Sequence, residues 1–326
     1  MKKLFSILMA AMMIAGVSAT AMADDTVNSV SLGNDASSGI ALDGALLKPG
    51  ETYKFPVSVT IGGETAALSE EILDDYNFRV SNSGEGKTVS TFEMVRTSGV
   101  YYLKVTAAAG WPASSTEESY KIKLSQKKAN SNSAELTVSF STGYAEAEDK
   151  VIHSLSAGDK VAVDNNHPVY TKDQLSDIAE LNNGRKVTFT GKGWEFMTSL
   201  SGQGAVNLLN NTNDVDEILE KYEENSFRFV TFPAGPKFRT SGSLVIDVED
   251  YAVDFNETFY VYRYLDGKLT ALSSSYDSFE ETLTVKTDTL GRFVITDKAI
   301  ADTTVVENGG QSSGSGTNNP GTGAAA

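Results

Sequence analysis

The sequence contains no cysteine among its 326 residues. Disulfides, thiolate zinc sites, iron–sulfur clusters and cysteine nucleophiles are therefore excluded, because each of them needs a cysteine sulfur. A secreted eukaryotic protein of this size usually carries disulfides. Their absence is typical instead of a bacterial exported protein whose domains depend on packed apolar cores alone.

Basic residues are also scarce. The chain has 27 Lys and Arg against 43 Asp and Glu, which gives a formal net charge of −16. Binding to phosphate-rich partners needs clustered Lys and Arg. We therefore expect no nucleic-acid partner and no attraction to anionic membrane surfaces.

Histidine is rare too, with only His153 and His167 in the chain. Neither belongs to a His-x-His or His-Glu-x-x-His pattern, so we expect no metal site and no cofactor that depends on them. Residues 310–314 match the spelling of a hydrolase nucleophile elbow, but they fall in a Gly/Ser-rich tail without the strand and helix that this motif needs. Residues 84–88 are similar to the end of a phosphate-binding loop, but no long helix follows them. The sequence therefore predicts that the protein is not an enzyme.

The acidic residues leave two alternatives open. Two carboxylates at a suitable separation would serve a secreted glycoside hydrolase, and the sequence offers many pairs. Asp247, Glu249, Asp250 and Asp254 lie at the end of a predicted strand, and their oxygens are of the kind that binds calcium. Their spacing matches no known calcium loop, so a solvated acidic loop is the favoured interpretation.

The N-terminus has the three parts of a secretory signal peptide. Two lysines follow the first methionine, Leu4–Val17 is mostly apolar, and Ala21–Ala23 provides small residues for cleavage. The apolar run is shorter than the roughly 20 residues that span a bilayer. We predict that residues 1–23 are removed, that the mature chain begins at Asp24, and that it does not insert stably into a membrane.

Short alternating strands separated by Gly, Asn and Ser turns dominate the rest of the chain, which is typical of β-sandwiches. The fold class is therefore predicted to be mainly β. Residues 24–147 are predicted to form an N-terminal immunoglobulin-like β-sandwich. Residues 148–300 are predicted to form a second sandwich with two short helices inserted. Residues 301–326 are rich in Gly, Ser and Asn and are predicted to be a flexible tail.

Local patterns predict individual elements. Residues 68–76 favour a short helix, because apolar residues recur there at helical spacing. Thr171–Gln174 is a capping box at the start of a helix, and Asn213 is predicted to cap a second helix. Asp266-Gly267 lies between two apolar runs and predicts a hairpin turn.

A row of tyrosines is one candidate binding site. Side chains alternate along a strand, so Tyr260, Tyr262 and Tyr264 of the predicted strand share one face. Tyrosines offer a large contact area to sugar rings or to a protein partner. Cross-strand packing within the sheet is the favoured alternative.

The two tryptophans have different surroundings. Trp111 precedes Pro112 in a predicted loop, where an exposed ring would contact a ligand and a buried ring would belong to the core. The sequence leaves these two interpretations of Trp111 open. Trp194 is predicted to lie in the core, because Phe196 repeats its face of a strand.

The tail carries a short motif, Asn319-Pro320-Gly321-Thr322-Gly323. It resembles the Leu-Pro-x-Thr-Gly sorting signal of Gram-positive surface proteins, with Asn in place of Leu. The resemblance implies that a sortase cleaves after the threonine and joins it to the cell wall. In that family an apolar span and a basic tail follow the motif, and neither is in this sequence. Either the chain is truncated at a degenerate motif, which the alanines after Gly323 favour, or residues 319–323 are only part of a flexible tail.

Three stretches of the body resemble clostridial surface proteins. Lys48–Tyr53 is similar to a hairpin that is common among them. Phe259–Leu272 and Thr282–Asp297 are similar to a terminal hairpin unit of their stalk and adhesin modules. These similarities imply a surface location and no particular activity.

The sequence thus predicts a secreted, extracellular protein, attached to the cell wall if the sorting motif is used. Its expected role is that of a non-enzymatic, adhesin-like binding or stalk protein, whose partner is a host or microbial glycan or a surface protein. Two alternatives stay open: a carbohydrate-binding protein that uses the tyrosine row or Trp111, and a secreted hydrolase that uses a carboxylate pair.

Overall fold

The computed structural model describes residues 26–82, 88–128, 132–252, 255, 258–301 and 303–304. The predicted signal peptide, the predicted sorting motif and Asp254 lie outside the described residues. The described chain is mainly β and of the sandwich type, as the sequence predicts. Contacts divide the chain into a first unit, Met1–Ala109 with Thr116–Thr142, and a second unit, Gly110–Ser115 with Gly143–Ala326.

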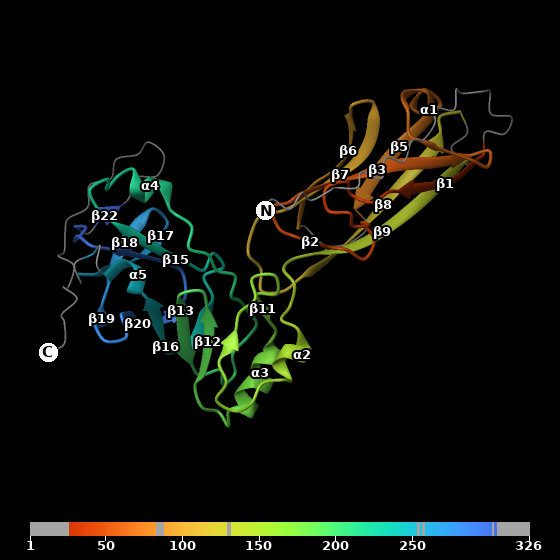
Figure 1. The fold of residues 1–326 in the computed structure, drawn as a ribbon. Helices are drawn as coiled ribbons and strands as arrows, with labels where there is room; N and C mark the ends of the chain where they lie inside the picture. The colour runs from red at the N-terminus through yellow and green to blue at the C-terminus, as the bar shows by residue number, and fades with distance from the viewer. Residues whose placement is uncertain are drawn as a thin grey trace, which may run out of the picture. The chain divides into compact units, whose positions relative to one another are not determined.

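The first unit has two sheets (Figure 1). One sheet contains, in order, β1 (Val27–Leu32), β3 (Thr52–Ile61), β7 (Val100–Ala107) and β6 (Val89–Thr97), with β4 (Glu64–Ala67) paired to β3. The other contains, in order, β2 (Leu46–Leu47), β9 (Ser133–Thr142), β8 (Thr116–Gln126) and β5 (Tyr76–Asn82). Helix α1 (Glu70–Asp75) precedes β5, close to where the sequence predicts a helix.

Alternate residues of these strands meet between the two sheets of the first unit. Phe55 of β3 and Leu103 of β7 come from one sheet, and Ile122 and Leu124 of β8 come from the other. All four side chains are fully buried. Burial of such a side chain contributes roughly 1.5–3 kcal/mol, so this layer is the main source of stability in a chain without cross-links.

One buried carboxylate fixes the connection between β1 and β2. Asp35 is 3% exposed. It accepts hydrogen bonds from the amide and the hydroxyl of both Ser37 and Ser38, and from the amide of Lys54 on β3. Burial raises the pKa of Asp35, but these donors outweigh it and lower the pKa from 3.8 to about 2.

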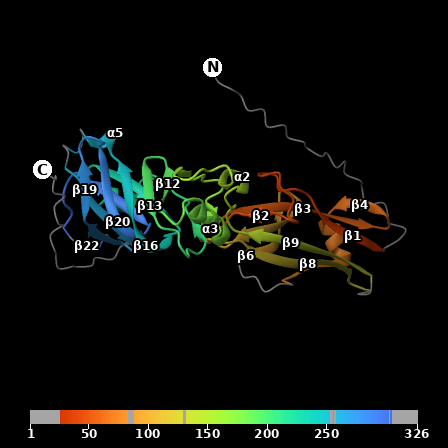
Figure 2. The same ribbon diagram turned by 90° about the horizontal axis from the view of Figure 1, so that it is seen from below.

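The second unit has two larger sheets and a small one. The six-stranded sheet contains, in order, β10 (Val161–Ala162), β12 (Val187–Gly191), β13 (Trp194–Thr198), β16 (Lys237–Asp247), β20 (Thr282–Thr289) and β19 (Ser274–Asp277). The five-stranded sheet contains, in order, β15 (Phe227–Thr231), β21 (Arg292–Thr296), β17 (Tyr260–Leu265), β18 (Lys268–Leu272) and β22 (Thr303–Thr304). The two-stranded sheet pairs β11 (Val169–Tyr170) with β14 (Val206–Asn207). Figure 2 shows β19 beside β20 at one side of this unit.

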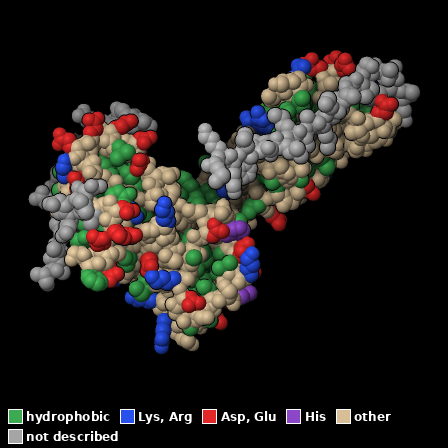
Figure 3. Space-filling model, viewed as in Figure 1, with side chains coloured by type: hydrophobic (Ala, Val, Ile, Leu, Met, Phe, Trp, Pro, Cys, Tyr) green, Lys and Arg blue, Asp and Glu red, His purple; other side chains and the backbone are tan. Residues whose placement is uncertain are grey.

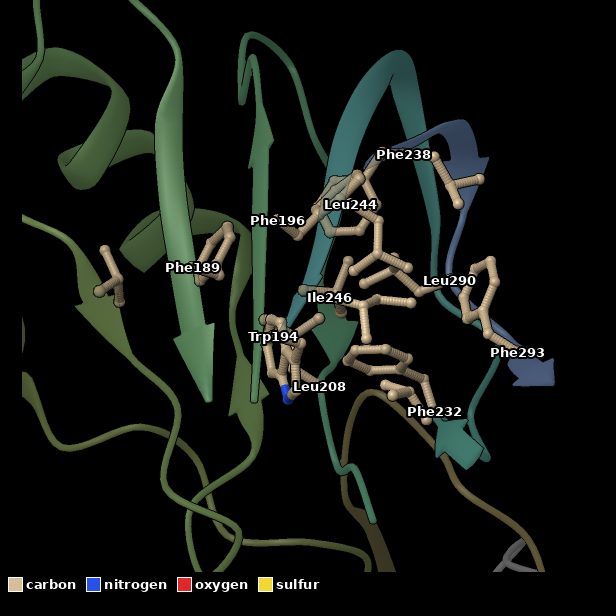
Figure 4. Close-up of a cluster of buried hydrophobic side chains, with 14 of the residues drawn as sticks. Phe189, Trp194, Phe196, Leu208, Phe232, Phe238, Leu244, Ile246, Leu290 and Phe293 are labelled. Atoms are coloured by element: carbon tan, nitrogen blue, oxygen red, sulfur yellow. The ribbon is translucent and has the colours of Figure 1, made fainter. Parts of the chain in front are cut away.

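An aromatic-rich cluster joins the two larger sheets of the second unit. Phe196 and Leu244 come from the six-stranded sheet, and Val261 and Phe293 come from the five-stranded sheet. All four side chains are fully buried. Figure 4 shows Phe196, Leu244 and Phe293 directed into this shared layer.

The helices of the second unit are short, namely α2 (Asp149–Ile152), α3 (Lys172–Leu181), α4 (Asp216–Leu219) and α5 (Glu249–Ala252). The capping box of α3 is confirmed, because Thr171 and Gln174 exchange side-chain and backbone hydrogen bonds. The predicted cap at Asn213 is wrong. Val215 stands at the N-cap of α4 and makes no side-chain capping bond. The amide of Asn213 instead donates to the side chain of Asn211, in a local turn that competes with helix initiation.

The hairpin predicted at Asp266-Gly267 is confirmed. Leu265 of β17 pairs with Lys268 of β18, so two residues make the turn. Their φ angles are 49° and 71°. Positive φ at both positions matches the right-handed twist of the flanking strands.

Within the described ranges, no helix has both the length and the apolar character needed to cross a bilayer.

Asp and Glu side chains are spread over the visible face of the second unit (Figure 3).

The low pKa of Asp35 predicts a pH-dependent stability. A carboxylate with a lower pKa in the folded chain stabilises it above the unfolded pKa, and this stabilisation is lost as the pH falls from about 4 towards 2. We expect Asp35→Asn to lower the free energy of unfolding at pH 7 by about 2 kcal/mol. Urea denaturation between pH 2 and pH 7 measures the effect.

The variant should also show a shallower loss of stability below pH 4 than the wild type. Glu51→Gln is the control, because Glu51 is an exposed acid close to β3 and its substitution should change the stability by less than about 0.5 kcal/mol. Parallel pH profiles for Asp35→Asn and the wild type would show that Asp35 is not the responsible group.

Candidate functional site

Trp111 is an exposed aromatic residue on a loop. Its side chain is 51% exposed. The loop follows β7 and precedes β8, and by its contacts residues 110–115 belong to the second unit. Of the two interpretations that the sequence leaves open, the structure favours the exposed one.

Hydrogen bonds from buried side chains hold this loop. Asn207 of β14, which is 1% exposed, donates its side-chain amide to the carbonyl of Pro112 over 3.0 Å. The hydroxyl of Tyr144 donates to the carbonyl of Gly110 over 3.4 Å. Both carbonyls adjoin Trp111, so the backbone on either side of its ring is positioned before any ligand arrives.

A close backbone approach holds the end of the loop. A Cβ atom on Gly143 would lie 2.9 Å from the Cα atom of Ser115. Only glycine fits there without displacing the loop. An aromatic ring on a fixed loop loses little conformational freedom when it binds, which favours affinity.

The tyrosine row is not an open platform, and the prediction that Tyr262 contacts a ligand is wrong. Tyr262 is fully buried. Its hydroxyl donates to the carbonyl of Ile300 over 2.9 Å and accepts from the amide of the same residue over 2.8 Å. Val215 and Ile218, at and within α4, pack in the same apolar cluster. The helix therefore covers the face that the tyrosines share.

The other two tyrosines of the row are half-buried at the border of this cluster. The Tyr264 hydroxyl donates to the carboxylate of Glu217 in α4 over 2.9 Å. The guanidinium of Arg292 lies 5.3 Å from the Tyr264 ring centre. Alternation does place Tyr260, Tyr262 and Tyr264 on one face, but that face serves packing.

Trp194 lies in the core, as the sequence predicts (Figure 4). Its indole nitrogen donates to the side-chain oxygen of Asn210 over 3.1 Å. Its ring meets that of Phe232 edge to face, with centroids 4.8 Å apart. A Cβ atom on Gly191 would lie within 2.4 Å of the indole nitrogen, so a glycine is needed beside it.

Two hollows on the described surface bear on the hydrolase alternative. In the first unit, a hollow of about 510 Å³ is bordered by Gly44, Glu117–Ser119 and Ser139–Ser141. Glu117 and Glu118 are consecutive in β8 and so point to opposite faces. Glu118 is 1% exposed and accepts from the amide and the hydroxyl of Thr88, at 2.7 and 2.6 Å. These two carboxylates cannot flank one glycosidic bond.

The other hollow, of about 260 Å³, lies in the second unit between α3 and residues 200–203. Glu180 is its one acidic lining residue, and Lys172 is its one basic lining residue. This composition does not provide the second carboxylate that glycoside hydrolysis needs.

Asp247, the candidate calcium ligand at the end of β16, and the two histidines make contacts with nearby backbone groups. Among the described residues, no group of three or more His, Cys, Asp or Glu side chains is placed to hold a metal ion. Asp247 accepts a hydrogen bond from the amide of Glu249 over 3.0 Å. The ring nitrogen Nδ1 of His167 lies 2.9 Å from the carbonyl oxygen of Glu146, and His153 ends α2.

No protein-family model matches the sequence, and no curated protein matches it. Among solved structures, the secreted serine protease VesC from Vibrio cholerae is 7% identical, with a TM-score of 0.24 over 90% of this chain and 48% of the protease. The chain thus spans about half the length of that protease.

The C-terminal domain of the AgI/II polypeptide BspA from Streptococcus agalactiae is 8% identical, with a TM-score of 0.20 over 82% of this chain and 89% of that domain. A chimeric titin Z1Z2 is 12% identical, with a TM-score of 0.19 over 36% of this chain and 93% of its own. These scores are too low to support an argument about family or function.

The different exposure of the two tryptophans predicts their fluorescence. Trp111 should be readily quenched by acrylamide, whereas Trp194 should be protected and emit at shorter wavelength. Trp111→Phe should therefore lower the quenching constant several-fold and shift the remaining emission to the blue. An unchanged quenching constant in Trp111→Phe would mean that the ring is not exposed in solution.

Proposed function

We propose that the protein is an exported, non-enzymatic binding protein of the bacterial cell surface, and that Trp111 contacts its ligand. The observation that carries this proposal is the half-exposed indole on a loop fixed at Gly110 and Pro112. Tryptophan is among the residues that contribute most to binding energy at interfaces. A monomeric protein gains nothing in stability from leaving such a ring in water.

The non-enzymatic part of the proposal is supported by the placement of the acids that border the hollows. Glu117 and Glu118 point to opposite faces of β8, and Glu180 borders its hollow without a second carboxylate. An acidic chain with packed β units suits a surface protein, because its charge limits non-specific attachment to anionic surfaces.

A glycan is the favoured ligand class, with a surface protein as the second candidate. The apolar face of a sugar ring stacks on an exposed indole. Ser114 and Ser115 follow in the same loop and are exposed, so hydroxyl groups that both donate and accept hydrogen bonds lie close to the ring in sequence.

The binding experiment compares variants of the mature chain on a glycan array and on host and bacterial cells. Trp111→Ala should weaken binding at least tenfold, equivalent to about 1.4 kcal/mol. Phe279→Ala is the matched control, because Phe279 is an exposed aromatic residue at a different turn of the second unit, at 89% exposure. Equal binding by Trp111→Ala and the wild type would contradict the assignment of Trp111.

The proposed location is tested by fractionation of a Gram-positive host. The mature protein should begin at Asp24, as read by N-terminal sequencing. If the sorting motif is used, part of the protein should be bound to the wall, and Thr322→Ala should move that part to the medium. A chain that keeps residues 1–23 and stays in the cell would contradict export.

A further inference from the structure

A second candidate surface is the outward face of the sheet β1-β3-β7-β6 in the first unit. Phe55 and Leu103 of this sheet point into the core, so by alternation their neighbours in the strands point outward. Cross-strand register arranges the outward residues in three rows, which are Thr52–Thr106–Thr91, Lys54–Lys104–Glu93 and Pro56–Tyr102–Val95. Each row runs across β3, β7 and β6, which lie side by side in Figure 1.

The row of Pro56, Tyr102 and Val95 is an apolar platform. All three side chains are partly exposed. Among the described residues, the hydroxyl of Tyr102 has no hydrogen-bond partner, so no hydrogen bond holds the side chain of this tyrosine. The row crosses three strands and therefore extends for roughly 10 Å. An aromatic ring between two aliphatic neighbours offers an apolar surface on which a sugar ring can stack.

The next row supplies charged groups. The ammonium of Lys104 lies 3.3 Å from a carboxylate oxygen of Glu93, and the two side chains are 32% and 55% exposed. Lys54 is exposed directly opposite Lys104 and makes no ion pair within the described part of the chain. Like charges directly opposite each other in a sheet are unfavourable. A ligand oxygen between the two ammonium groups would relieve this repulsion.

The two rows are two residues apart along each strand, a distance of roughly 7 Å. A pyranose ring on Tyr102 would therefore place its hydroxyls at the charged row. Each sugar hydroxyl both donates and accepts, whereas lysine only donates and glutamate only accepts. An adjacent Lys–Glu pair is therefore complementary to two neighbouring hydroxyls.

We infer that this face binds a neutral saccharide. The apolar side of one pyranose ring stacks on Tyr102, and a vicinal diol bridges Lys104 and Glu93, with Lys54 as a further donor. The threonine row beyond, in which the hydroxyls of Thr52 and Thr106 lie 2.9 Å apart, provides polar contacts for a neighbouring ring. Glu93 beside Lys104 needs a hydrogen-bond donor from the ligand, which a hydroxyl provides and a carboxylate does not, so a neutral saccharide is favoured over an anionic one.

This inference does not rest on the role of Trp111. The two surfaces belong to different units, so either can fail without the other. Trp111→Ala should leave binding at the Tyr102 face unchanged, and Tyr102→Ala should leave any binding at Trp111 unchanged.

The experiment titrates neutral oligosaccharides, such as cello-, manno- and galacto-oligosaccharides, into the mature protein by calorimetry. Lys104→Gln and Glu93→Gln should each weaken binding of the best ligand roughly tenfold. Tyr102→Ala should abolish it, with Tyr102→Phe as a variant that keeps the ring. Both charge variants are at exposed positions, so their melting temperatures should stay close to that of the wild type.

A second ion pair in the same unit gives a matched control. Lys123 and Glu135 also pair across two strands at 3.3 Å, with 41% and 47% exposure, but in the other sheet. Lys123→Gln and Glu135→Gln should leave the affinity unchanged. Failure of every neutral saccharide to bind, equal losses in the control pair, or tighter binding of uronic-acid oligosaccharides than of their neutral counterparts would overturn the inference.

Discussion

Burial of alternate strand residues between paired sheets is the constraint on which both units depend. The chain has no cysteine, so no covalent link limits the unfolded ensemble. Stability must come from layers such as Phe55 with Ile122 in the first unit and Phe196 with Phe293 in the second. Because a strand alternates, each inward residue fixes the outward direction of its neighbours. The surfaces that remain for binding are therefore set by the same pattern that builds the cores.

The five-stranded sheet of the second unit shows what happens when both faces are used. Its inner face carries Val261 and Phe293 in the large core, and its other face carries Tyr262 beneath α4. The tyrosine hydroxyl would be costly to bury alone, and Ile300 satisfies it as donor and as acceptor. The residues that look most like a binding surface in the sequence are thus used to attach a helix.

The sequence was sufficient to predict a structural element wherever the interactions that form it join residues close together in the chain. The capping box at Thr171 and the turn at Asp266-Gly267 depend on neighbours within three residues, and both were predictable. The exposure of a side chain depends on contacts with residues far away in the sequence, so the exposure of Trp111 could not be predicted. The loop of Trp111 is held by Asn207, 95 residues further along the chain from Pro112. Val215, Ile218, Leu219 and Tyr222 recur at helical spacing, which indicates a helix with one apolar face, but only the fold shows that this helix covers the face of Tyr262.

The charge in the row beside Tyr102 differs in sign from the net charge of the chain. The excess of acidic residues repels anions at long range, but at physiological salt this repulsion fades beyond roughly 8 Å. The row beside Tyr102 holds two lysines and one glutamate. Asp35, whose carboxylate accepts from the Lys54 amide, already receives five hydrogen bonds. Lys104 and Glu93 thus present a donor and an acceptor side by side where a ligand would lie, and Lys54 adds a further donor. Such a pair favours hydroxyl groups over carboxylates, because a hydroxyl can accept from an ammonium and donate to a carboxylate, whereas an ionised carboxylate only accepts.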